Sequence, residues 1–112
     1  MTTTRDTLIA ARALIAEPGR WTQGATARRA ADNTSTGASS PDSARWCMRG
    51  AIQAANRGTW INENAAVERL CDVLGDPESL ADWNDAPERR HEDVLAAFDK
   101  AIAALDATGD AR

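Results

Sequence analysis

The sequence predicts a mainly α-helical protein, a compact bundle of four principal helices, with residues 1–112 forming a single small domain. Apolar residues recur with helical spacing in four separate segments, and glycine or proline follows most of these segments. A chain of 112 residues is also long enough to bury one core. Alanine supplies much of the hydrophobic content, so the predicted helices must pack closely.

The first predicted helix covers residues 4–16. Leu8, Ala11 and Ile15 share one face of this segment, and Pro18-Gly19 follows as a stop signal. Its apolar face is expected to contribute to the core.

A loop or a small β-hairpin is predicted after the first helix, in residues 25–40. Ala, Thr, Ser and Gly dominate this stretch, which fits a surface loop, while Asp32-Asn33 would suit the turn of a short hairpin. The second helix is predicted to open at Ser40-Pro41, a good cap followed by a proline in the first turn, and to end at Gly58.

The third predicted helix begins near Asn62, and its apolar stripe ends at Gly75. A short helical turn follows. The last helix starts either at a cap formed by Asp85 or near Arg90, and residues 107–112 are expected to form a frayed tail.

Charge is distributed unevenly along the chain. Residues 1–57 carry eight arginines against four acids, a charge of +4, whereas residues 58–112 carry five basic residues against thirteen acids, a charge of −8. The basic half could contact an acidic partner, or the two halves could neutralise each other within the fold. No apolar run approaches the ~20 residues that span a membrane. Without a signal-peptide pattern at the N-terminus, we expect a cytoplasmic protein with no membrane association.

The chain contains the residue types used by Cys-His-Asn/Asp hydrolases and transferases. In these enzymes a histidine, here His91, takes the proton of a thiol, here Cys47, and an amide or carboxylate, here Asn84 or Asp85, orients the base. The alternative is structural: Cys47 would sit in a close helix contact, and His91 would bond a neighbouring backbone group. We favour the structural interpretation and predict no catalytic residue, because no nucleophile elbow or glycine-rich loop accompanies them.

A basic stripe is predicted on the second helix. Arg45, Arg49 and Arg57 are spaced four and eight residues apart, which would place them on one helical face that could lie along phosphates or pair with the acids of the next helix. Trp21 and Gln23 could line a groove, but we favour a structural role in which Trp21 covers the end of the first helix and Gln23 satisfies loop backbone. The candidate binding residues are Trp21, Gln23, Arg45, Arg49, Asn84 and Asp85.

Metal and cofactor sites have no sequence support. The single histidine and the two cysteines are separated by twenty or more residues, without the short ligand spacings of zinc sites. No glycine-rich phosphate loop is present. We therefore expect no metal and no cofactor.

Three phrases in order resemble a known family. They are ARALIAEPGRWTQGA at residues 11–25, RWCMRGA at residues 45–51, and WNDAP at residues 83–87 followed by His91 and residues 94–102. Together they resemble a bacterial domain-of-unknown-function family, number 6197, over nearly the whole chain. The resemblance implies a small, mostly helical protein and supplies no activity. Family members often have Thr where this chain has Arg90, a difference that favours the earlier helix start at Asp85.

These observations lead to one preferred function and two alternatives. We predict a non-catalytic protein-interaction or regulatory module whose partner is a protein, and a homodimer is compatible with the small-residue face of the second helix. The first alternative is a small enzyme that uses Cys47 and His91. The second is nucleic-acid binding through the arginine stripe.

Overall fold

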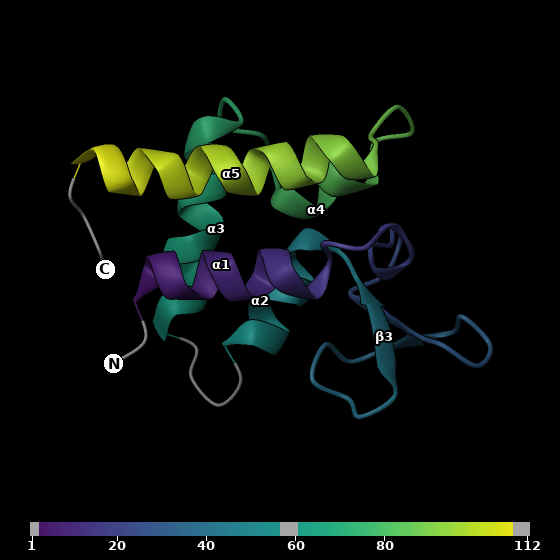
Figure 1. The fold of residues 1–112 in the computed structure, drawn as a ribbon. Helices are drawn as coiled ribbons and strands as arrows, with labels where there is room; N and C mark the ends of the chain where they lie inside the picture. Colours follow the sequence, from purple (N-terminus) through teal and green to yellow (C-terminus); the bar gives the residue numbers. More distant parts are fainter. Residues whose placement is uncertain (1–2, 57–60, 109–112) are drawn as a thin grey trace.

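The computed structural model describes residues 3–56 and 61–108 of the chain (Figure 1). It contains five α-helices, one 3-10 turn (η1) and a three-stranded antiparallel sheet within these residues. The predicted four-helix bundle is therefore wrong, because a sheet stands between the first helix and the second. In order the elements are α1 (Thr4–Leu14), η1 (Pro18–Arg20), β1 (Ala27–Arg29), β2 (Ser35–Thr36), β3 (Ser43–Trp46), α2 (Met48–Ala55), α3 (Ile61–Val73), α4 (Leu80–Asp85) and α5 (His91–Thr108).

Helices α1 and α5 lie side by side and run in opposite directions, with α3 crossing behind them and the sheet at one end (Figure 1). Leu8 of α1 is fully buried, as are Ile15, which caps the end of α1, and Phe98 of α5. Ion pairs close the solvent side of this contact, with Arg5 2.6 Å from Asp106. The core thus lies between the helices and continues to the inner face of the sheet.

The start of α1 follows its sequence signals. The Thr3 hydroxyl accepts a hydrogen bond from the Asp6 amide at 3.0 Å, and the Asp6 carboxylate accepts one from the Thr3 amide at 3.2 Å. This capping box satisfies two of the amides that a helix N-terminus leaves unpaired. The prediction of a helix over residues 4–16 is correct to within two residues at its end.

The hairpin alternative for residues 25–40 is confirmed. Strands β1 and β2 pair in antiparallel fashion, and Asn33 takes a positive φ of 60° in the turn between them. The Asp32 carboxylate accepts hydrogen bonds from the Thr34 amide at 3.1 Å and from its hydroxyl at 2.7 Å. Those bonds lower the pKa of Asp32 below its ordinary value, because they favour the charged form.

The predicted start of the second helix at Ser40-Pro41 is wrong. Residues of this stretch form β3, which pairs with the free edge of β1, and α2 begins at Met48. The Trp46 indole donates a hydrogen bond to the Ala38 carbonyl at 2.9 Å and holds the strand against the core. Pairing with β1 prevails over the local cap signal because it satisfies backbone groups of both strands. The predicted end at Gly58 lies outside the described residues.

The start of the last helix is the later of the two predicted positions. Helix α5 begins at His91, and the Arg90 amide donates to the Asp93 carboxylate at 2.9 Å. The cap predicted at Asp85 is wrong, because Asp85 is the last residue of the separate helix α4. Helix α5 continues through the first two residues of the predicted tail, and residues 109–112 lie outside the described part.

Gly50 allows α2 to approach the chain just before β1. A Cβ atom at this position would lie 2.0 Å from the Thr26 carbonyl oxygen, well inside contact distance. The same carbonyl accepts a hydrogen bond from the Cys47 amide at 3.1 Å. Gly50 of α2 therefore lies directly against the backbone of Thr26, just before the sheet.

Replacement of Gly50 by alanine is expected to lower the free energy of unfolding by about 2 kcal/mol or more, because helix and strand must separate to accept the methyl group. Urea denaturation measures this difference. Gly37→Ala is the matched control, since a Cβ atom there meets nothing within 4 Å. Equal stability of the two variants would contradict the close approach.

Candidate functional site

The side chain of Asn84 is the centre of the polar region predicted to be functional. It is fully buried. Its Oδ1 atom accepts hydrogen bonds from the Trp21 indole at 2.8 Å and from the Met48 amide at 3.0 Å. Its Nδ2 atom donates to the Thr22 carbonyl at 3.1 Å and to the Asp85 carboxylate at 2.9 Å. All four hydrogen-bonding positions of the amide are thus filled.

Three segments meet at this amide. Met48 is the first residue of α2, whose amide would otherwise be an orphan donor at a helix N-terminus. Trp21 follows η1, and Asn84 itself belongs to α4. Asn84 therefore joins the connection after α1 to the start of α2 and to α4.

Gln23 and Asp85 reinforce the same junction. The Gln23 side-chain amide donates to the Asn84 carbonyl at 2.8 Å and to the Ala86 carbonyl at 3.0 Å, which satisfies acceptors at the end of α4. The Asp85 carboxylate accepts the Gly24 amide at 2.9 Å. The four predicted binding residues Trp21, Gln23, Asn84 and Asp85 are brought together, but they bond chiefly to one another and to nearby backbone.

Each residue of the catalytic alternative makes a separate structural hydrogen bond. The Cys47 sulfur caps α2 by accepting the Gly50 amide at 3.3 Å. His91 Nε2 lies 2.6 Å from the Ile15 carbonyl oxygen at the end of α1. Among the described residues no hydrogen bond joins Cys47 to His91, and the Asp85 carboxylate accepts its hydrogen bonds from the Gly24 amide and the Asn84 side chain. The thiol, the imidazole and the carboxylate therefore do not form the hydrogen-bonded chain through which a catalytic histidine takes a proton from a thiol.

Burial weakens the nucleophile further. Cys47 is 6% exposed. Burial raises the pKa of the Cys47 thiol above its ordinary value. Hydrogen bonds from the Gly50 and Arg49 amides oppose this rise, and the charge of Asp85 adds a smaller upward effect. A raised pKa leaves less thiolate at neutral pH, which is the opposite of what a nucleophilic cysteine needs.

The His91 ring also packs on an aromatic neighbour. It stacks on Trp21 with 6.1 Å between ring centroids and 29° between planes. Because Trp21 is bonded to Asn84, this stack links the start of α5 to the Asn84 junction. His91 in turn bonds the Ile15 carbonyl just after α1, so the ring of Trp21 packs on a residue that contacts the end of α1.

Two hollows lie near these residues. One, of about 210 Å³, is small for a ligand pocket, which usually measures ~300–1,000 Å³. Its polar groups are already engaged, since Asp85 accepts the Gly24 amide and Arg49 lies 3.3 Å from Glu63. It is lined by Gly24, Ala25, Thr26, Cys47, Arg49, Ala81 and Asp85.

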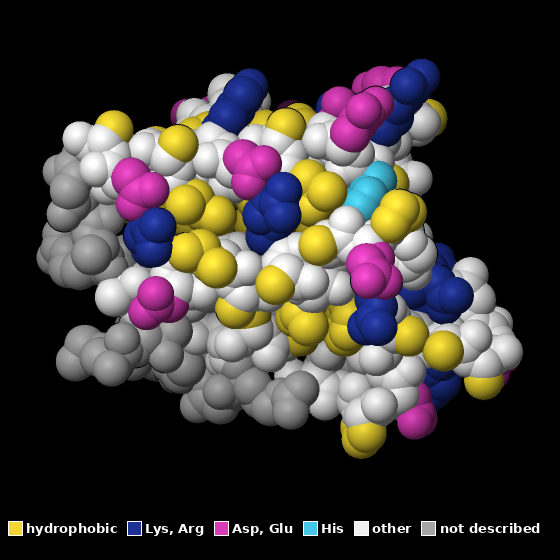
Figure 2. Space-filling model, viewed as in Figure 1, with side chains coloured by type: hydrophobic (Ala, Val, Ile, Leu, Met, Phe, Trp, Pro, Cys, Tyr) yellow, Lys and Arg dark blue, Asp and Glu magenta, His cyan; other side chains and the backbone are white. Residues whose placement is uncertain are grey.

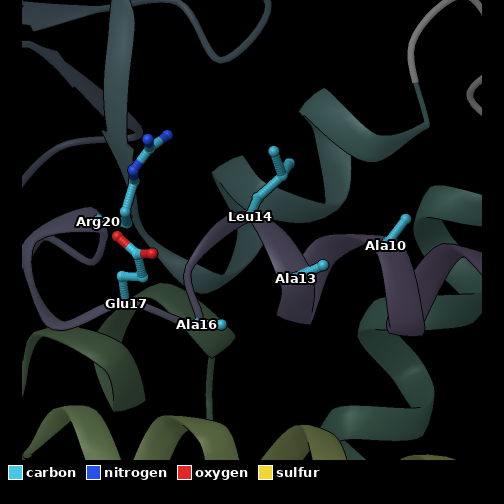
Figure 3. Close-up of a pocket in the computed structure, with 6 residues that line it drawn as sticks. All are labelled: Ala10, Ala13, Leu14, Ala16, Glu17 and Arg20. Carbon is cyan, nitrogen blue, oxygen red and sulfur yellow. The ribbon is translucent and has the colours of Figure 1, made fainter.

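The other hollow, of about 360 Å³, lies beside the C-terminal half of α1 (Figure 3). Figure 3 shows Glu17 and Arg20 at its η1 end, while short apolar side chains from α1 line the rest. Alanine methyl groups form most of this apolar part, so it offers few convergent polar groups to orient a small molecule. It is lined by Ala10, Ala13, Leu14, Ala16, Glu17 and Arg20.

The predicted arginine stripe on the second helix is wrong. Arg45 lies on β3, and Arg49 lies on α2, where it pairs with Glu63. Arg57 lies outside the described residues. The register instead places Arg45 opposite Arg28 on β1. Sequence analysis missed Arg28, because only the strand pairing brings these two residues together.

The remaining classes of site find no support in the part of the chain that is described. No group of three His, Cys, Asp or Glu side chains there could hold a metal ion. None of the described helices combines the length and the apolar character that crossing a membrane requires.

Residues 1–104 match the model of DUF6197, a family of unknown function. The chain belongs to this family. The resemblance drawn from residues 11–25, 45–51 and 83–102 is thereby confirmed, and it covers the fold from α1 into α5. No curated protein and no solved structure gave a match to the chain.

Replacement of Asn84 by alanine is expected to lower the free energy of unfolding by about 3 kcal/mol, because it leaves the buried Met48 amide and the part-buried Trp21 indole without acceptors. Thermal and urea denaturation measure the loss. Asn64→Ala, at an exposed position of α3, is the matched control and should change stability little. If both variants unfold at the same urea concentration, the junction does not stabilise the fold.

Proposed function

We propose that this member of DUF6197 acts by binding another protein and performs no catalytic step. One observation carries the proposal: the thiol, the imidazole and the carboxylate of the catalytic alternative are each already engaged in holding the fold. The Cys47 sulfur caps α2, the His91 ring bonds the end of α1, and the Asp85 carboxylate bonds the Gly24 amide.

The shape of the molecule supports the same conclusion. The hollow next to Cys47 is small, and the larger hollow beside α1 lacks the convergent polar groups that orient a substrate. Residues of types typical of functional sites, such as Trp21, Asn84 and Cys47, therefore join structural elements to one another. Binding through an outer surface requires none of these buried groups to react.

The thiol is expected to react slowly with iodoacetamide. In a Cys71→Ala variant, Cys47 is the single thiol, and its raised pKa and burial should make alkylation at pH 7.5 slower than that of free cysteine. In 8 M urea the rate should rise to that of free cysteine. The pH profile of the folded protein should be displaced to higher pH, since burial favours the neutral thiol. Alkylation faster than free cysteine would contradict the absence of a nucleophile.

Affinity capture tests the binding half of the proposal. Immobilised wild-type protein should retain a specific protein from an extract of the organism that encodes it, and Cys47→Ala should retain the same protein equally well. Asn64→Ala serves as a folded control with an exposed substitution. Retention that depends on the Cys47 thiol would favour the enzyme, and retention no greater than on a column carrying an unrelated protein would overturn the binding function.

A further inference from the structure

The sheet region is a basic area on an otherwise acidic molecule. Residues 18–50, which include the sheet, carry five arginines against two aspartates, a net charge of +3. Because the whole chain has a net charge of −4, the remaining residues carry −7. Figure 2 shows Lys and Arg side chains beside Asp and Glu over α1 and α5, and both kinds again over the end that carries the sheet, where Arg29 lies 3.6 Å from Asp42. By count, arginines outnumber carboxylates at this end, which leaves it with a net positive charge.

The sheet register places two of these arginines directly opposite each other. Arg28 on β1 pairs with Arg45 on β3, next to the pair formed by Ala27 and Trp46. Ala27 and Trp46 are buried, so their side chains face the core, and the alternation of strand side chains directs Arg28 and Arg45 to the outer face. Like charges opposite each other on one face of a sheet are destabilising.

No carboxylate of the described residues neutralises this pair. Arg28 donates to the Thr22 hydroxyl at 3.0 Å and to the carbonyls of Gln23 and Asn33 at 3.2 and 3.0 Å. Arg45 donates to the Arg29 carbonyl at 3.2 Å. All these acceptors are neutral.

Other arginines of the protein show the contrast. Arg5 lies 2.6 Å from Asp106, Arg12 lies 2.6 Å from Asp99, and Arg49 lies 3.3 Å from Glu63. A guanidinium has about five N–H donors, so Arg28 and Arg45 both keep donors for a further acceptor. Their present bonds hold the two groups in place without neutralising them.

We propose that the outer face of β1 and β3 binds a short acidic segment of a partner protein, with carboxylates bonded to Arg28 and Arg45. This inference rests on the proposed binding function and names the chemistry of its partner. Arginine and carboxylate form charge-assisted, often bidentate hydrogen bonds, which would remove the repulsion between the two arginines.

The extent of the face favours a peptide over a nucleic acid. Strands β1 and β3 have three and four residues, so the face extends over roughly 13 Å along a strand. Duplex DNA carries a charge about every 1.7 Å along its axis. Its phosphates would continue beyond the face toward the acidic remainder of the molecule, whereas a peptide with a few carboxylates would not.

A fluorescein-labelled hexapeptide with four glutamates provides the test, by fluorescence anisotropy at 20 mM NaCl. Wild type should bind it, added NaCl should weaken the binding, and Arg45→Gln should weaken it about tenfold through loss of one charge-assisted contact. Lys100→Gln, an exposed change on α5, removes the same charge far from the sheet and should leave affinity unchanged. Far-UV circular dichroism verifies that both variants fold.

Equal affinities of wild type and Arg45→Gln, or no binding at low salt, would overturn this inference, as would tighter binding of a single-stranded oligonucleotide of equal charge. Affinity capture of the natural partner distinguishes failure of this inference from failure of the proposed binding function. If Arg45→Gln retains the captured partner as well as wild type does, the acidic-segment inference fails while the binding function stands. Loss of that partner with Arg45→Gln, but not with Lys100→Gln, supports both.

Discussion

The fold depends on one buried side-chain amide. Asn84 is fully buried, and its two acceptor positions and two donors are all matched: by Trp21 and Thr22 after η1, by Met48 at the start of α2, and by the neighbouring Asp85. A buried polar group with unmet partners would be costly, so this arrangement is stable only as a complete set. It fixes where the turn after η1 meets the first turn of α2 and the end of α4, and through the Trp21 stack it also reaches α5.

This constraint explains why residues of types common in binding sites have a structural role in this protein. Trp21, Gln23, Asn84 and Asp85 are the polar and aromatic types typical of binding sites, yet their hydrogen bonds run chiefly to each other and to neighbouring backbone. Cys47 acts in the same way as the cap of α2. The proposed recognition of a partner would therefore use the outer surface, where no carboxylate of the described residues pairs with Arg28 or Arg45.

The sequence allowed α1, α3 and α5 to be predicted, because their apolar residues repeat with a strong helical period. It did not allow β3 to be predicted, since Ser43 to Trp46 lacks the alternation of a half-buried strand and follows a serine and proline that resemble a helix cap. The residues of the Asn84 junction were identified as a group, but not their bonds, because partners such as Thr22 and Met48 contribute backbone atoms that any residue could supply. The pairing of Arg28 with Arg45 likewise depends on register, which local patterns in so short a strand do not specify.

Hydrogen exchange at the two donors bound to Asn84 Oδ1 tests the central claim most directly. The Trp21 indole N–H and the Met48 amide have no regular backbone acceptor, so slow exchange of either must come from the Asn84 side chain. In ¹⁵N-resolved spectra both should exchange as slowly as amides in the middle of α5. Exchange of these two protons at the rate of a free indole and an unprotected amide would contradict the account, because the segments would then be joined by something other than Asn84.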